Sequence, residues 1–139
     1  SKLRLKNKKI VFTNGCFDLL HRGHLQYLSQ AKKIGDVLIL GLNSDQSVKM
    51  LKGEGRPINN ESDRANMLSF MNFIDYIIIF DEQTPLKLIK KIEPDILVKG
   101  GDYIENQVVG ADFAKKVVII PFLDGFSSSE LINRIIKKK

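Results

Sequence analysis

Short apolar runs alternate with segments of helical periodicity along the chain, and this alternation constrains the fold most strongly. The runs are rich in Ile and Val and cover residues 10–12, 37–42, 76–80, 96–98 and 117–120. Uninterrupted runs of this kind are typical of strands that are covered on both faces. Between them, apolar residues recur at helical spacing, as in Leu25, Leu28 and Ala31. Strands that alternate with helices predict a parallel sheet with right-handed crossovers.

The predicted fold is therefore α/β, a doubly wound parallel sheet that forms one domain over residues 1–139. A length of 139 residues with 43% hydrophobic residues suits a domain of this size without disulfide or metal support. The single cysteine, Cys16, excludes an internal disulfide and a zinc site made of cysteines alone. A reduced, cytoplasmic setting is expected.

Capping residues mark the ends of the predicted helices. They are Ser62 and Asp63 before the second helix, Thr84 as cap and Pro85 in the first turn of the third, and Ser127, Ser128 and Ser129 before the last. Gly35 is expected to close the first helix. Residues 52–60 and 100–113 fit neither period, and loops of this length are commonly functional or mobile. We expect the first of them to act as a lid that orders over bound nucleotide.

The charge distribution does not favour nucleic-acid binding, although the net charge is +6 and the pI is about 9.4. Eight of the basic residues lie in residues 1–9 and 137–139, and the rest of the chain has 14 basic against 16 acidic residues. Terminal runs of lysine are usually solvated. No apolar run approaches the length that spans a bilayer, and no signal-type segment follows the basic N-terminus. We expect neither nucleic acid nor membrane as a partner.

The first strand leads into the segment that carries the clearest chemistry. His21 and His24 flank Gly23 where the first helix begins, at the edge of the sheet where ligands of such folds bind. Free backbone amides and the helix dipole favour phosphate there, and imidazoles can donate hydrogen bonds to phosphate oxygens. A His-x-Gly-His tetrapeptide alone equally fits two structural histidines.

Two motifs resemble the nucleotidyltransferase superfamily of the cytidylyltransferase type. The first runs without a gap from Gly15 to His24, and the second is the serine-rich turn at 124–132. The resemblance implies a Rossmann-like nucleotidyltransferase fold, with the serine turn as both a helix cap and a phosphate cradle. Relatives of the cytidylyltransferase type often have an Arg shortly before this turn, where this chain has Asp124.

Further segments are similar to the heptose-1-phosphate adenylyltransferase family. They are residues 13–18, 42–45, 51–58 and 98–103. Such enzymes occur as separate proteins or as C-terminal domains of bifunctional kinase/adenylyltransferases. The resemblance implies transfer of AMP from ATP to a sugar 1-phosphate by direct attack of the sugar phosphate on the α-phosphorus, with release of pyrophosphate. It also implies a homodimer, because dimers are common among these relatives.

The resemblance and the placement at strand ends together predict the site. The catalytic residues are His21, His24 and Lys52. The nucleotide-binding residues are Thr13, Asn14, Gly15, Cys16, Phe17, Asp18, Gly23, Asn43, Arg64, Lys99, Gly100, Asp102, Ser127, Ser128 and Ser129. The residues that bind the sugar phosphate are Asp18, Lys52 and Arg56. Mg²⁺ is expected to be held mainly by phosphate oxygens and water, with Asp18 as a candidate contact.

Several of these residues have plainer interpretations, which the sequence leaves open. Lys52 and Arg56 also fit an exposed basic loop, and Asp102 fits a turn after two glycines. Cys16 is interpreted as a structural thiol, not a nucleophile. The functional alternatives are a cytidylyltransferase that acts on glycerol 3-phosphate or a similar alcohol phosphate, a nucleotide-binding domain without catalysis, and a nucleic-acid binder that uses the basic ends.

Overall fold

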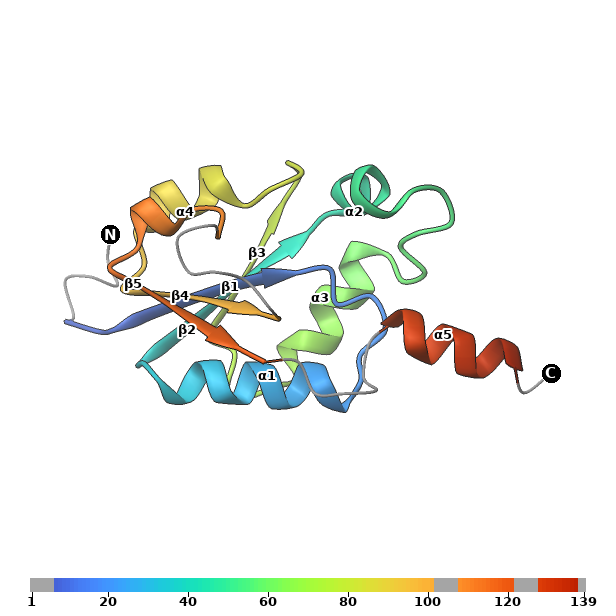
Figure 1. Ribbon diagram of the computed structural model, residues 1–139, viewed down its shortest axis with the longest axis horizontal. Helices are drawn as coiled ribbons and strands as arrows, with labels where there is room; N and C mark the ends of the chain where they lie inside the picture. Colours follow the sequence, from blue (N-terminus) through green and yellow to red (C-terminus); the bar gives the residue numbers. More distant parts are fainter. Residues whose placement is uncertain (1–6, 102–107, 122–127, 138–139) are drawn as a thin grey trace.

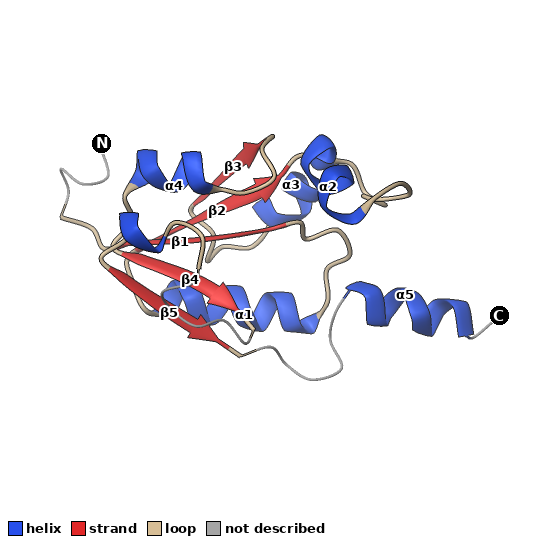
Figure 2. Cartoon of the chain, turned by 45° about the horizontal axis from the view of Figure 1, so that its top comes forward, coloured by secondary structure: helices blue, strands red, loops and turns tan. Residues whose placement is uncertain are grey.

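A computed structural model describes residues 7–101, 108–121 and 128–137. Five strands form one sheet: β1 Ile10–Gly15, β2 Val37–Asn43, β3 Tyr76–Phe80, β4 Ile96–Gly100 and β5 Lys116–Ile120. The strands lie in the order β3-β2-β1-β4-β5, and each described pair is parallel. All five strands point toward the same end of the molecule (Figure 2). The predicted α/β class and parallel sheet are confirmed.

The helices are α1 Arg22–Lys33, α2 Asp45–Lys52, α3 Glu61–Ser69, α4 Leu86–Ile92 and α5 Ser128–Lys137, with a short 3-10 turn at Ala111–Phe113. Figure 1 shows α4 above the sheet, and α1 and α3 below it. Leu28 of α1 and Leu68 of α3 pack in one apolar cluster with Leu40 of β2, while Ile89 of α4 packs on the opposite face. The sheet is therefore buried on both sides, as the apolar runs predict.

The order of the strands places a topological switch point at β1. The chain moves from β1 through β2 to β3 on one side and then returns to β4 on the other side. Ligands in such sheets bind outside the carboxyl ends of the strands where this reversal occurs. The turn after Gly15 and the end of β4 at Gly100 both lie at this edge of the sheet. The edge of the sheet at which the topology predicts ligand binding is therefore the edge at which the first motif lies.

Helix α2 was not predicted, because it is only eight residues long and follows β2 after a single residue. Its start is stabilised by Ser44, whose hydroxyl accepts a hydrogen bond from the amide of Ser47 at 3.1 Å. Only Ser47 and Val48 are buried in it. The helix ends at Lys52, so the first residue of the predicted lid is helical.

The predicted helix starts need two corrections. Helix α3 begins at Glu61, with Asn60 as the cap that accepts from the Asp63 amide at 2.8 Å, so Ser62 and Asp63 lie inside the helix. Helix α4 begins at Leu86, and Pro85 occupies the cap position without a side-chain hydrogen bond. Proline suits the first positions of a helix because it lacks the amide that would go unpaired there. Thr84 is therefore not the cap.

Gly35 follows α1 as predicted, but for a different reason. Its backbone is not among those with positive φ, and a Cβ atom at this position would collide with Cγ2 of Val11. The close approach of the helix end to β1, not a left-handed cap, requires glycine. No helix in residues 7–101, 108–121 and 128–137 is long and apolar enough to cross a membrane.

Candidate functional site

The two histidines of the first motif meet at the start of α1. His21 is the N-cap residue and His24 lies in the first turn. Their rings stack with centroids 3.8 Å apart and an interplanar angle of 23°. The ring of Phe17 contacts His24 edge-on, with centroids 5.1 Å apart. The two imidazoles therefore lie together, as their spacing predicted, and His24 packs against the buried ring of Phe17.

Burial and nearby positive charge keep His24 neutral. Burial is the main cause that lowers its pKa to about 4, and His21 and Lys52 lower it further. Burial also lowers the pKa of His21. Among the described residues, Nδ1 of His24 is buried without a hydrogen-bond partner. Neutral imidazoles beside a lysine at a helix N-terminus suit an anion. The negative charge of the anion stabilises the imidazolium that forms when a histidine gains a proton there.

This arrangement predicts a measurable shift at His24. We expect its pKa to lie near 4 in the free protein and to rise when pyrophosphate binds, since phosphate charge stabilises the imidazolium. The unfolded chain has the ordinary pKa of 6.5 at His24, so between pH 6.5 and 4 it binds a proton that the folded protein does not bind. The stability of the folded protein should therefore fall as the pH drops from 6.5 toward 4. NMR titration of the imidazole signals with and without pyrophosphate measures the shift. An unchanged pKa in saturating pyrophosphate would argue against phosphate contact.

Asp18 is buried at the candidate site and bonded to other residues of the protein. We call the edge of the sheet around His21 and His24 the histidine rim, or the rim. Its side chain is 1% exposed and accepts hydrogen bonds from the amides of Ile58 and Asn59 at 2.8 Å and from Nε of Arg56 at 2.9 Å. Burial alone would raise its pKa, but these hydrogen bonds outweigh burial and lower it. With its oxygens occupied by N–H donors, Asp18 does not fit as a contact for Mg²⁺ or for the sugar phosphate in this structure.

Asp18 also limits the predicted lid. Residues 56–59 are attached to the turn after β1 through its carboxylate and through its carbonyl, which accepts from Nδ2 of Asn59 at 2.8 Å. Only Lys52, Gly53, Glu54 and Gly55 form a fully exposed tip. Arg56 keeps one donor for an anion, because among the described residues its Nη2 is buried without a partner.

We expect Asp18→Ala to release this loop. Limited proteolysis of the variant should cut residues 52–60 faster than it cuts the wild type, because four hydrogen bonds are lost, and the one from Arg56 is also an ion pair. Asp63→Ala, which removes an exposed carboxylate in the next helix, serves as the control. Equal cleavage of Asp18→Ala and wild type would show that the carboxylate does not hold the loop.

Three of the predicted nucleotide-binding side chains lie inside the protein. The Thr13 hydroxyl is paired with the Tyr27 hydroxyl at 2.6 Å, and Nδ2 of Asn43 donates to Ser47 Oγ at 2.9 Å. Arg64 has no exposed surface, and each of its nitrogens is bonded to protein. The structure thus shows these three side chains bonded to protein, and their contact with a nucleotide stays a prediction. Position at the end of a strand does not determine which way a side chain points.

Cys16 and two lysines lie around the switch point. Burial raises the pKa of the Cys16 thiol, although Lys52 and Arg64 act in the opposite direction. Burial lowers the pKa of Lys99 on β4, and Cys16 acts electrostatically on it. Cys16 is thus held as a neutral thiol between lysines from α2 and β4, which agrees with its interpretation as a structural residue.

The remaining predicted residues are placed in part. Gly15 ends β1 next to half-buried Asn14, Gly23 lies in the first turn of α1, and Gly100 ends β4. Ser128 and Ser129 begin α5, which lies beyond the carboxyl ends of the strands (Figures 1 and 2). Asp102, Ser127 and the side chains of Ser128 and Ser129 are outside the described part, so the second motif stays a prediction.

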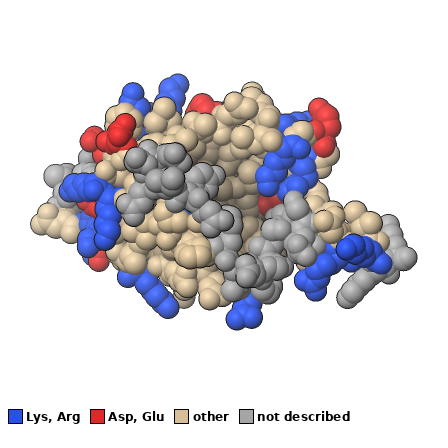
Figure 3. Space-filling model, viewed as in Figure 1, with Lys and Arg blue, Asp and Glu red and all other residues tan. Residues whose placement is uncertain are grey.

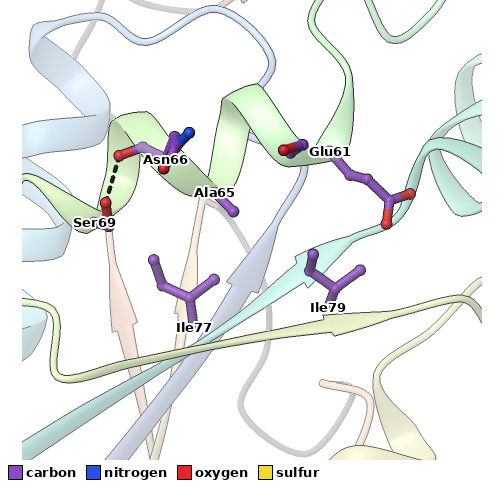
Figure 4. A pocket seen from close by; sticks show the side chains of 7 residues that line it. Glu61, Ala65, Asn66, Ser69, Ile77 and Ile79 are labelled. Carbon is purple, nitrogen blue, oxygen red and sulfur yellow. Dashed lines mark hydrogen bonds between the residues drawn. The ribbon is translucent and has the colours of Figure 1, made fainter.

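A separate groove of about 460 Å³ lies between α3 and the edge strand β3 (Figure 4). Its lining consists of Glu61, Ser62, Ala65, Asn66, Ser69, Ile77 and Ile79, and it contains none of the predicted site residues. On the face drawn in Figure 3, basic side chains form separate groups around the edge, with acidic ones among them. The histidine rim therefore remains the candidate site.

The chain is similar to several known proteins. The model of the cytidylyltransferase-like family matches residues 12–134. The bifunctional protein HldE of Campylobacter jejuni subsp. doylei is 60% identical over 99% of the chain, and that of Wolinella succinogenes is 58% identical over 95%. The chain spans 30% and 28% of the lengths of these relatives. The lipopolysaccharide core biosynthesis protein of Thermoplasma volcanium has a similar structure, with a TM-score of 0.71, 29% identity, and coverage of 84% of this chain and 99% of that one.

Proposed function

Because the chain belongs to the cytidylyltransferase-like family of nucleotidyltransferases, we propose that it transfers AMP from ATP to a heptose 1-phosphate, which gives ADP-heptose and pyrophosphate. The observation that carries the proposal is the stacked pair of neutral histidines beside Lys52 at the switch point. The heptose-type motifs, the HldE relatives and the lipopolysaccharide core biosynthesis neighbour support a sugar phosphate as acceptor.

The reaction needs no protein nucleophile. An oxygen of the sugar phosphate attacks the α-phosphorus in line, the bond from that phosphorus to the bridging oxygen breaks, and the electron pair leaves with pyrophosphate. Alignment and charge neutralisation then dominate catalysis. His21 and His24 donate hydrogen bonds to the phosphates as negative charge builds up, and Lys52 adds a positive charge. The neutral Cys16 thiol takes no part.

Mg²⁺ accompanies ATP in this proposal and neutralises phosphate charge when bound. The described residues contain no group of three or more metal-ligating side chains, and the oxygens of Asp18 are occupied. The metal would therefore be held by phosphate oxygens and water. What this chain supplies is the histidine pair, Lys52 and the free donor of Arg56.

The choice of nucleotide separates this proposal from the cytidylyltransferase alternative. Pyrophosphate release should be measured with ATP or CTP, each with heptose 1-phosphates, other sugar 1-phosphates and glycerol 3-phosphate. We expect ATP with a heptose 1-phosphate to give the highest kcat/KM. A clear preference for CTP with glycerol 3-phosphate would overturn the proposal.

Light scattering at working concentration tests the homodimer that we propose from the same resemblance, and a monomer would contradict it.

A further inference from the structure

Arg64 connects the separate chain segments that build the rim. Its Nε donates to the Asn59 carbonyl at 2.9 Å, and Nη1 donates to the carbonyls of Cys16 at 2.8 Å and Asn43 at 2.7 Å. Its Nη2 forms an ion pair with Asp45 at 2.9 Å. One guanidinium on α3 thus holds the turn after β1, the end of β2, the start of α2 and the loop before α3.

Each of these attachments leads to a group that we assign to phosphate binding. Cys16 directly precedes Phe17, whose ring contacts His24. Asp45 is the first residue of α2, and Lys52 is its last. Asn59 belongs to the loop that carries Arg56 and is attached to Asp18. A rotation at any of these points would move an imidazole or a cation relative to the others.

The geometry points to Arg64 as a positioning residue, which sets the distance between His24 and Lys52 and does not touch the nucleotide. This inference rests on the proposed function and deepens it. A buried guanidinium needs both charge and hydrogen-bond partners, and the planar fork of arginine reaches several acceptors in fixed directions. Arg64 has no exposed surface, so its partners are the protein's own carbonyls and Asp45. Lysine would keep the charge but lose the fork.

The test compares Arg64→Met and Arg64→Lys with a control in another part of the core. Ile89→Ala removes a fully buried side chain of α4, on the opposite face of the sheet, and destabilises the protein without changing the apolar cluster that contains Phe17. For each variant, thermal unfolding gives the folded fraction, and kcat and KM for ATP are measured per folded molecule. NMR gives the pKa of His24, a readout that does not require the substrate to be known.

We expect Arg64→Met to lower kcat about 10²-fold, the scale for displaced catalytic groups, while KM for ATP changes much less. The pKa of His24 should rise, because Lys52 no longer lies at its set distance. Arg64→Lys should show a smaller loss. Ile89→Ala should lose stability and keep both kcat per folded molecule and the His24 pKa. Wild-type values in Arg64→Met, or the same shifts in Ile89→Ala, would overturn the inference.

Asp45→Ala keeps the test decisive if both Arg64 variants fail to fold. The Asp45 side chain is 40% exposed, and its removal takes away the ion pair of Arg64 with the start of α2, while the Asp45 amide stays bonded to Glu61. We expect a several-fold loss in kcat and a raised pKa of His24. An unchanged His24 pKa would contradict the positioning role. Absence of turnover in the wild type with every substrate would instead contradict the proposed function, while the NMR result would still decide the role of Arg64.

Discussion

We expect His21→Ala and His24→Ala each to lower kcat about 10²-fold or more, the cost of removing one donor that acts mainly in the transition state. The rings stack at the start of α1, and burial favours the neutral form of both. A neutral imidazole has one N–H group, so each ring can donate one hydrogen bond. KM for ATP should change less, because the phosphate charge that the rings stabilise builds up during transfer.

The matched control is Gln26→Ala, an exposed position on the same helix. It should keep wild-type turnover, and all three variants should unfold at similar temperatures. Steady-state kinetics with pyrophosphate detection, together with thermal unfolding, measures both quantities. Unchanged turnover in either histidine variant would remove that residue from the proposed mechanism.

We expect Gly15→Ala to reduce both stability and turnover. A Cβ atom at Gly15 would lie 2.7 Å from Cε2 of Phe17, and this ring is buried against His24. Overpacking of this kind costs about 1–3 kcal/mol. The ring can only move by disturbing the position of His24, so kcat per folded molecule should fall as well.

Gly35→Ala provides a closely matched comparison. A Cβ atom there would collide with Cγ2 of Val11, before the start of β2 and at the end of the sheet opposite the candidate site. It should cost similar stability while turnover per folded molecule stays at the wild-type value. Unfolding experiments and kinetics on both variants check the pair. An equal loss of turnover in both would mean that Phe17 has no particular effect on His24.

The order of strands and helices could be predicted from the sequence because strands buried on both faces appear as continuous apolar runs. Helix α2 could not, since it is only eight residues long with only Ser47 and Val48 buried, and its start is stabilised by the polar contact of Ser44 with Ser47. The cap at Asn60 was missed because Ser62 and Asp63 have equally good capping side chains.

The sequence indicates where the candidate site lies, but only partly in which direction its side chains point. The spacing of His21 and His24 indicated a common location, and the rings do meet. A resemblance gives the position of Arg64 but not its direction. Its spacing of four from Leu68 could have indicated that both face the core, and both are fully buried. The interior role of Asp18 depends on a loop 40 residues away, which no local pattern reports.

The central claim is that AMP passes directly from ATP to a sugar phosphate on the histidine rim. Isotope exchange between labelled pyrophosphate and ATP tests it most directly, with and without the sugar phosphate acceptor and its nucleotide product. Direct transfer predicts no exchange when both are absent and rapid exchange when they are supplied. Exchange without them would reveal an adenylylated enzyme, and no exchange under either condition would contradict the claim.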